Sequence, residues 1–97
     1  MTSSLLSSIP KLNGNNYHDW KFAIQMILRK AHCWDVISGQ VAKPAMRTGE
    51  DSWSKKSEEG LTTIGLTIEP TQFVYIRDIT EGPAAWKALA DIYEKNL

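Results

Sequence analysis

The sequence predicts an all-α fold, a small bundle of about four to five helices. Apolar residues recur at helical spacing in three segments, and turn or helix-capping residues separate those segments. The 97-residue chain also has four widely spaced tryptophans, Trp20, Trp34, Trp53 and Trp86. Because an aromatic side chain buries roughly 150–250 Å², we expect these indoles to converge in one helical core.

The first helix is expected over residues 17–31, after an extended segment at 9–12 and an Asn-Gly turn in which Asn15 or Asn16 is the N-cap. One stripe of its surface, about 100° wide, holds Tyr17, Trp20, Ile24, Ile27, Leu28 and Ala31. Phe22 and Met26 fall on nearly the opposite side, one turn apart. A helix with two apolar faces has two neighbours, and one of them need not belong to the same chain. The alternative partners of Phe22 and Met26 are the N-terminal leader and the segment 70–77.

Two helices and a loop are expected in the middle of the chain. Residues 33–37 predict a short helix stopped by Gly39, and residues 40–49 a loop. The next helix begins at Asp51 or Ser52 and carries on one side Trp53, Ser57, Gly60, Leu61, Ile64 and Ile68. Because a glycine costs a helix about 1 kcal/mol relative to alanine, we interpret Gly60 and Gly65 as sites where a neighbouring backbone approaches closely. A hinge is the alternative.

The last third of the chain predicts two more helical segments. Pro70 suits the first turn of a helix over residues 71–77. Residues 73–76 are rich in β-favouring side chains, but a lone strand would have no partner in this sequence. Thr80 is expected to cap the final helix, whose apolar stripe holds Ala85, Trp86, Leu89, Ile92 and Tyr93. No stop signal precedes Leu97, so we expect this helix to run on and the natural polypeptide to continue.

Length and composition predict a flexible leader at residues 1–8 and a single helical domain at 9–97, truncated at its C-terminus. Hydrophobic residues make up 42% of the chain, which argues against disorder. Lys plus Arg and Asp plus Glu balance at 11 each, so the chain lacks the positive charge that phosphate contacts require. Neutrality also permits self-association. Whether Lys21, Arg29 and Lys30 form a local basic patch that touches RNA stays open.

No residue pattern predicts catalysis. Cys33 is the only cysteine, so it closes no internal disulfide and builds no zinc knuckle, and it indicates a reducing, cytoplasmic location. His32 and Cys33 are adjacent, so on a helix their side chains diverge. Glycine-rich phosphate loops, paired-carboxylate motifs and membrane-length apolar runs are not visible. We therefore expect no enzyme, cofactor, metal, membrane or small-molecule substrate, and we interpret Lys55, Lys56, Glu58 and Glu59 as a solvated helix face.

Several segments are more specific than the apolar pattern that any helix of a globular protein shows. Residues 11–21 read KLNGNNYHDWK, residues 34–39 read WDVISG, and residues 84–94 read AAWKALADIYE. Pro44 lies in the loop that follows the second expected helix, and Trp53 opens the helix after that loop. In this order, from Leu12 to Glu94, the segments resemble the Gag polyproteins of copia-type LTR retrotransposons. Gly60 departs from the alanine that this family often has at the corresponding position.

The resemblance implies the N-terminal lobe of a capsid-like domain, whose copies assemble into the shell of a virus-like particle around the element RNA. The partner would be the chain itself, as a homo-oligomer, with RNA bound only through regions outside this chain. We expect the core anchors to be Tyr17, Trp20, Trp34, Trp53, Trp86, Leu89 and Tyr93, and the self-association surface to include Phe22 and Met26. The alternative is a Gag-derived module that a host has domesticated to bind a protein partner.

Overall fold

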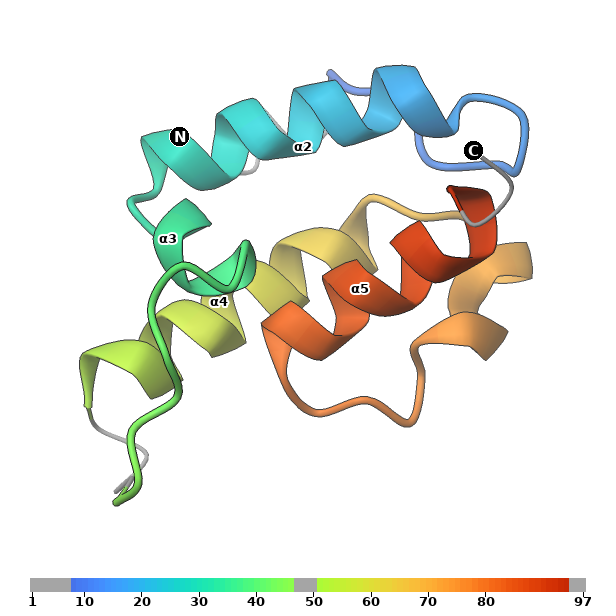
Figure 1. Ribbon diagram of the computed structural model, residues 1–97. Helices are drawn as coiled ribbons and strands as arrows, with labels where there is room; N and C mark the ends of the chain where they lie inside the picture. The colour runs from blue at the N-terminus through green and yellow to red at the C-terminus, as the bar shows by residue number, and fades with distance from the viewer. Residues whose placement is uncertain (1–7, 47–50, 95–97) are drawn as a thin grey trace.

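The computed structural model describes residues 8–46 and 51–94, in which five helices follow one another (Figure 1). They are α2 (Tyr17–Lys30), α3 (Trp34–Ile37), α4 (Ser52–Leu66), the 3₁₀ helix η1 (Pro70–Tyr75) and α5 (Gly82–Tyr93). Helix α2 lies along one side of the bundle, and α4 and α5 pack against each other on the other side. The predicted all-α fold is confirmed. The expected leader lies outside the described residues except for Ser8.

Helix α2 begins and ends close to its predicted bounds. Asn16 is its N-cap residue, but the Asn16 side chain stabilises the preceding turn: Oδ1 accepts the Asn13 N–H at 3.0 Å and Nδ2 donates to the Lys11 carbonyl. At the other end His32 adopts a left-handed backbone, with φ of 62°, and the Cys33 N–H bonds back to the Leu28 carbonyl at 3.0 Å. This closing turn satisfies carbonyls at the helix end and starts α3 at a sharp angle to α2.

The extended segment before α2 pairs with the chain that follows α4. The Leu12 N–H donates to the Thr67 carbonyl at 2.9 Å, and the Glu69 N–H donates to the Leu12 carbonyl at 3.0 Å. Within the described residues this is an isolated parallel bridge. It corrects the expectation that Ile68 belongs to the third helix, because α4 ends at Leu66 and Ile68 pairs with Leu12.

A slot between α4 and α5 receives the side chain of Ile37 from α3. A Cβ added to Gly60 would lie 2.2 Å from Ile37 Cδ1, and one added to Gly82 would lie 2.4 Å from the same atom. The close neighbour of Gly60 is therefore a side chain, where we expected a backbone, and Gly65 has nothing within 4 Å. The close backbone approach occurs instead at Gly82, which the sequence analysis did not single out.

The last three helices show what sequence reasoning found and missed. Asp51 caps α4 as expected, because its Oδ1 accepts the Ser54 N–H at 2.8 Å. The segment after Pro70 is helical, and the strand alternative is wrong. The expected Thr80 cap is also wrong: Glu81 is the N-cap residue of α5, and Ser57 of α4 accepts the Gly82 N–H at 2.9 Å, so a neighbouring helix supplies the acceptor.

The expectation that the final helix runs to Leu97 is not met. Helix α5 ends at Tyr93, with Glu94 as its C-cap residue. Residues 95–97 lie outside the described range.

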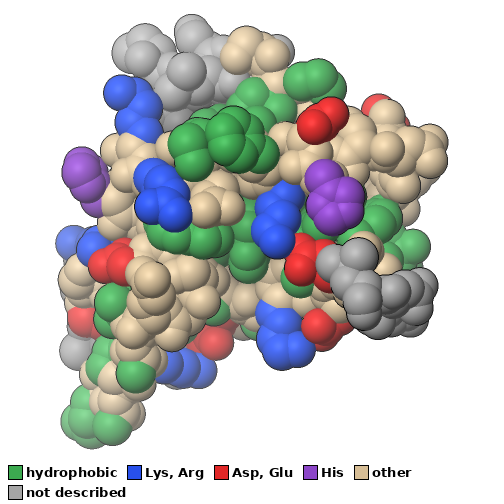
Figure 2. Space-filling view, turned by 45° about the horizontal axis from the view of Figure 1, so that its top comes forward, with side chains coloured by type: hydrophobic (Ala, Val, Ile, Leu, Met, Phe, Trp, Pro, Cys, Tyr) green, Lys and Arg blue, Asp and Glu red, His purple; other side chains and the backbone are tan. Residues whose placement is uncertain are grey.

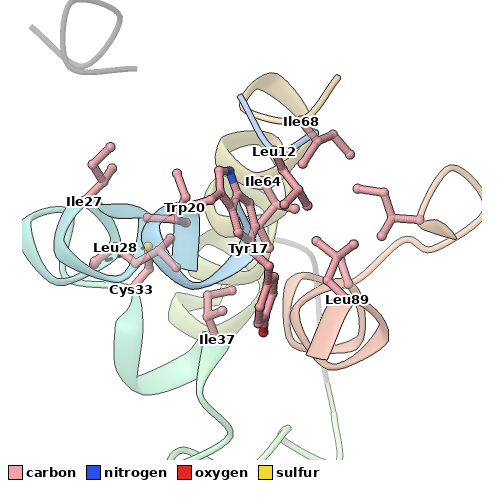
Figure 3. Packing of buried hydrophobic residues seen from close by; sticks show 13 residues of the cluster. Leu12, Tyr17, Trp20, Ile27, Leu28, Cys33, Ile37, Ile64, Ile68 and Leu89 are labelled. Atoms are coloured by element: carbon pink, nitrogen blue, oxygen red, sulfur yellow. Dashed lines mark hydrogen bonds between the residues drawn. The ribbon is translucent and has the colours of Figure 1, made fainter. Parts of the chain in front are cut away.

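The core lies where the inner faces of α2, α3, α4 and α5 meet the residues that connect them (Figure 3). Its buried cluster consists of Leu12, Tyr17, Trp20, Ile24, Ile27, Leu28, Cys33, Ile37, Ile64, Ile68, Ile76, Ala85 and Leu89. Burial of such apolar surface is the main favourable term in folding. The apolar stripe predicted for the first helix supplies Tyr17, Trp20, Ile24, Ile27 and Leu28 to this cluster, so α2 is fixed to the bundle by one face.

Candidate functional site

Three of the four indoles are in contact. Trp20 of α2 stacks on Trp86 of α5 with ring centroids 5.9 Å apart, and Trp34 of α3 meets Trp86 edge-on at 5.4 Å. Trp20 is only 2% exposed, whereas Trp34 and Trp86 are half-buried. The Trp20 Nε1–H donates to the Thr67 carbonyl at 2.9 Å, which satisfies its polar atom inside the core. These three rings join α2, α3 and α5.

Of the other expected core anchors, three lie in or against the core cluster and Trp53 lies outside it. Leu89 is fully buried, and Tyr17, 5% exposed, stacks on the half-buried ring of Tyr93 at 4.9 Å. Trp53 is buried in α4 but lies outside the cluster of the other indoles; the Lys43 ammonium sits 5.9 Å from its ring centroid. The convergence expected of all four indoles therefore holds for three.

A polar cluster joins the start of α2 to the end of α5. Glu94 accepts a hydrogen bond from the Tyr17 hydroxyl and an ion-paired hydrogen bond from Lys21 Nζ at 2.6 Å. The hydrogen bond from Lys21, followed by that from Tyr17, lowers the pKa of the Glu94 carboxyl. Burial, and then the contact with Glu94, raise the pKa of the Tyr17 hydroxyl. The Tyr93 hydroxyl donates to Gln72 of η1. These bonds serve to hold helix ends together.

The outer face of α2 is the surface that bears Phe22 and Met26. Phe22 is 66% exposed and Met26 is 41% exposed, so neither belongs to the core of this chain. Asp19, Arg29 and the neighbouring Lys30 are also exposed. The face of the molecule in Figure 2 shows hydrophobic side chains with Lys or Arg on one side and an acidic side chain on the other. We call the residues Asp19, Phe22, Met26 and Arg29 the α2 outer face.

A second exposed apolar cluster was missed by sequence reasoning. Phe73, Val74 and Tyr75 of η1 are 42%, 57% and 41% exposed, while Gln72 is buried. In the sequence, residues 73–76 stand out only as a run rich in β-favouring side chains, which does not indicate whether they are exposed. The buried Gln72 of the same helix accepts a hydrogen bond from the Tyr93 hydroxyl, so the polar side chain lies against α5 and the apolar run faces outward.

The single thiol of the chain is held inside the core. Cys33 is fully buried, its Sγ–H points at the Leu28 carbonyl, and burial raises the pKa of the thiol to about 11. A thiol in this state is a poor nucleophile near neutral pH. Across residues 8–46 and 51–94, His, Cys, Asp and Glu do not gather into a group of three that could hold a metal. No helix in this range has the length and apolar character needed to cross a membrane.

Together these features define a small helical domain built around an aromatic cluster, with an apolar helix face left exposed. The family model of the gag-polypeptide of LTR copia-type matches residues 24–97, and the chain belongs to this family. The match includes three of the resembling segments, those around Trp34, Trp53 and Trp86; residues 11–21 precede it. Neither the curated proteins nor the solved structures include a match.

Proposed function

We propose that this domain is a structural capsid subunit of a copia-type element, which self-associates in the cytoplasm through the α2 outer face to build a particle shell. The observation that carries the proposal is the 66% exposure of Phe22 on a helix whose other face is buried in the core of a Gag-family domain. We further propose that the domain is not an enzyme and that regions outside it contact the RNA, in keeping with its balanced charge of 11 cations and 11 anions.

The exposed apolar area sets the expected strength of the contact. Full burial of a Phe or Met side chain is worth about 1.5–3 kcal/mol, so covering the exposed parts of Phe22 and Met26 offers about 2–3 kcal/mol per copy. Association costs at least about 4 kcal/mol in lost translational and rotational freedom. The contact is therefore expected to be weak, as suits a shell in which each subunit makes several contacts.

Sedimentation equilibrium over a concentration series tests this proposal. The wild-type chain should form dimers or larger species as concentration rises. Phe22→Asp should stay monomeric with unchanged helical content in circular dichroism. Met46→Asp is the matched control, because Met46 is 87% exposed in the loop after α3, so this substitution introduces the same charge away from α2. It should associate like wild type.

Two outcomes would contradict the proposal. A wild-type chain that stays monomeric at all concentrations would oppose a shell role and favour the domesticated protein-binding module. Equal weakening by Phe22→Asp and Met46→Asp would show that added negative charge, rather than the α2 outer face, governs association. If Phe22→Asp unfolds the domain, Phe22→Gln supplies the same comparison without a charge.

A further inference from the structure

We infer that the α2 outer face binds the same face of a second copy, with the two helices antiparallel about a two-fold axis. The inference rests on the proposed self-association and names its partner surface and register. It is carried by the order of side chains along the face, which is acidic at one end, apolar in the middle and basic at the other end.

The spacing of these side chains is symmetric about Ile24. Asp19 and Arg29 lie five residues before and after this position, and Phe22 and Met26 lie two residues before and after it. At about 100° per residue, all four outer residues fall within a stripe about 80° wide, opposite the buried side of Ile24. In an antiparallel pair centred there, Phe22 of each copy faces Met26 of the other, and Asp19 faces Arg29.

The charged ends are available for this pairing. Asp19 makes no ion pair among the described residues, and the guanidinium of Arg29 lies 5.5 Å from the Trp34 ring centroid. A guanidinium held over an aromatic ring by a cation–π contact can still donate N–H groups to a carboxylate. Trp34 would thus hold the Arg29 guanidinium at the basic end of the α2 outer face. The register also sets His18 opposite Lys30 at the margins of the contact, where the pair adds no attraction.

A two-fold contact uses each favourable pair twice. Four apolar side chains would be covered and two Asp–Arg pairs formed, whereas a parallel arrangement would place like charges together. The antiparallel arrangement also aligns the two helix dipoles favourably. The second copy is therefore the occupant that the charge pattern fits.

Charge reversal tests the register directly. Asp19→Arg and Arg29→Asp should each raise the dissociation constant about tenfold or more, because like charges then face each other twice in the dimer. An equimolar mixture of the two single variants should recover near-wild-type affinity as a heterodimer, since both charge pairs are restored. The double variant Asp19→Arg/Arg29→Asp should recover as a homodimer. Lys87→Glu, on the exposed side of α5, is the control and should have no effect.

The outcomes separate this inference from the proposed function. If Phe22→Asp abolishes association but neither the mixture nor the double variant recovers, the α2 outer face meets a different surface and the two-fold register is wrong. If the charge variants all associate like wild type, the Asp–Arg pairing is likewise wrong. If the wild type does not associate at all, the proposed function fails together with this inference.

Discussion

Replacing Gly82 by alanine probes the close backbone approach at which α5 begins against α4. The new Cβ would lie 2.6 Å from the Ser57 carbonyl oxygen and 2.4 Å from Ile37 Cδ1. The side chain of Ile37 can shift only within a buried slot, and the Ser57 carbonyl belongs to the backbone of α4. Overpacking of this kind lowers the free energy of unfolding by about 1–3 kcal/mol. Alanine also reduces the conformational entropy of the unfolded chain relative to glycine, which raises the free energy of unfolding by about 0.4–1 kcal/mol.

The net loss for Gly82→Ala should therefore be about 1–2 kcal/mol. For a domain of this size each kcal/mol moves Tm by about 4–8 °C, so thermal unfolding followed by circular dichroism should show a fall of roughly 5–15 °C. All samples need the same low protein concentration, since association itself raises Tm.

Gly65→Ala is the matched control, in the last turn of α4 with nothing within 4 Å of the added Cβ. It should raise stability by about 0.5–1 kcal/mol through helix propensity. A Gly82→Ala variant that melts at or above the wild-type temperature would refute the close packing of α4 and α5 described above. A Gly65→Ala variant that melts lower would refute the open environment of Gly65.

Three further predictions concern the core and its polar contacts. Trp20→Ala should cost about 3–5 kcal/mol, enough to unfold a marginal domain, and a cooperative urea transition near that of wild type would contradict its core role. The Cys33 thiol should react with a disulfide reagent only after denaturation. Because burial raises the pKa of this thiol from 9.0 to about 11, its contribution to stability should be complete below pH 9 and should fall as pH rises toward 11. Fast labelling of the native protein would argue against its burial. Glu94→Gln should lower stability by at most about 1 kcal/mol at neutral pH, by loss of the Lys21 ion pair. Because the Glu94 pKa is lowered in the fold, wild type and variant should converge in urea melts as pH falls below 4.5, and a constant difference would contradict this linkage.

The sequence predicted a helix well where the residues that determine it lie within that helix or directly beside it. The stripe from Tyr17 to Leu28 predicted both the helix and its buried face, and Asp51 predicted the start of α4. The failures involve partners distant in sequence. Ser57 of α4 replaces the expected Thr80 cap, and pairing with Leu12 takes Ile68 out of the helix.

The same distinction applies to the candidate site. Helical geometry alone placed Phe22 and Met26 away from the core stripe, and both are exposed. Phe73 lies exposed on η1, the helix whose buried Gln72 accepts a hydrogen bond from Tyr93 of α5. No local pattern contains that bond, because its two residues are 21 positions apart.

Binding of a second copy of the chain to the α2 outer face can be observed in solution. Amide ¹H–¹⁵N spectra recorded over a concentration series test it most directly, because they report contact residue by residue. We expect concentration-dependent shifts or broadening centred on Asp19, Phe22, Met26 and Arg29, with the amides of α5 little changed. A spectrum that does not change with concentration, or changes confined to η1 around Val74, would contradict it.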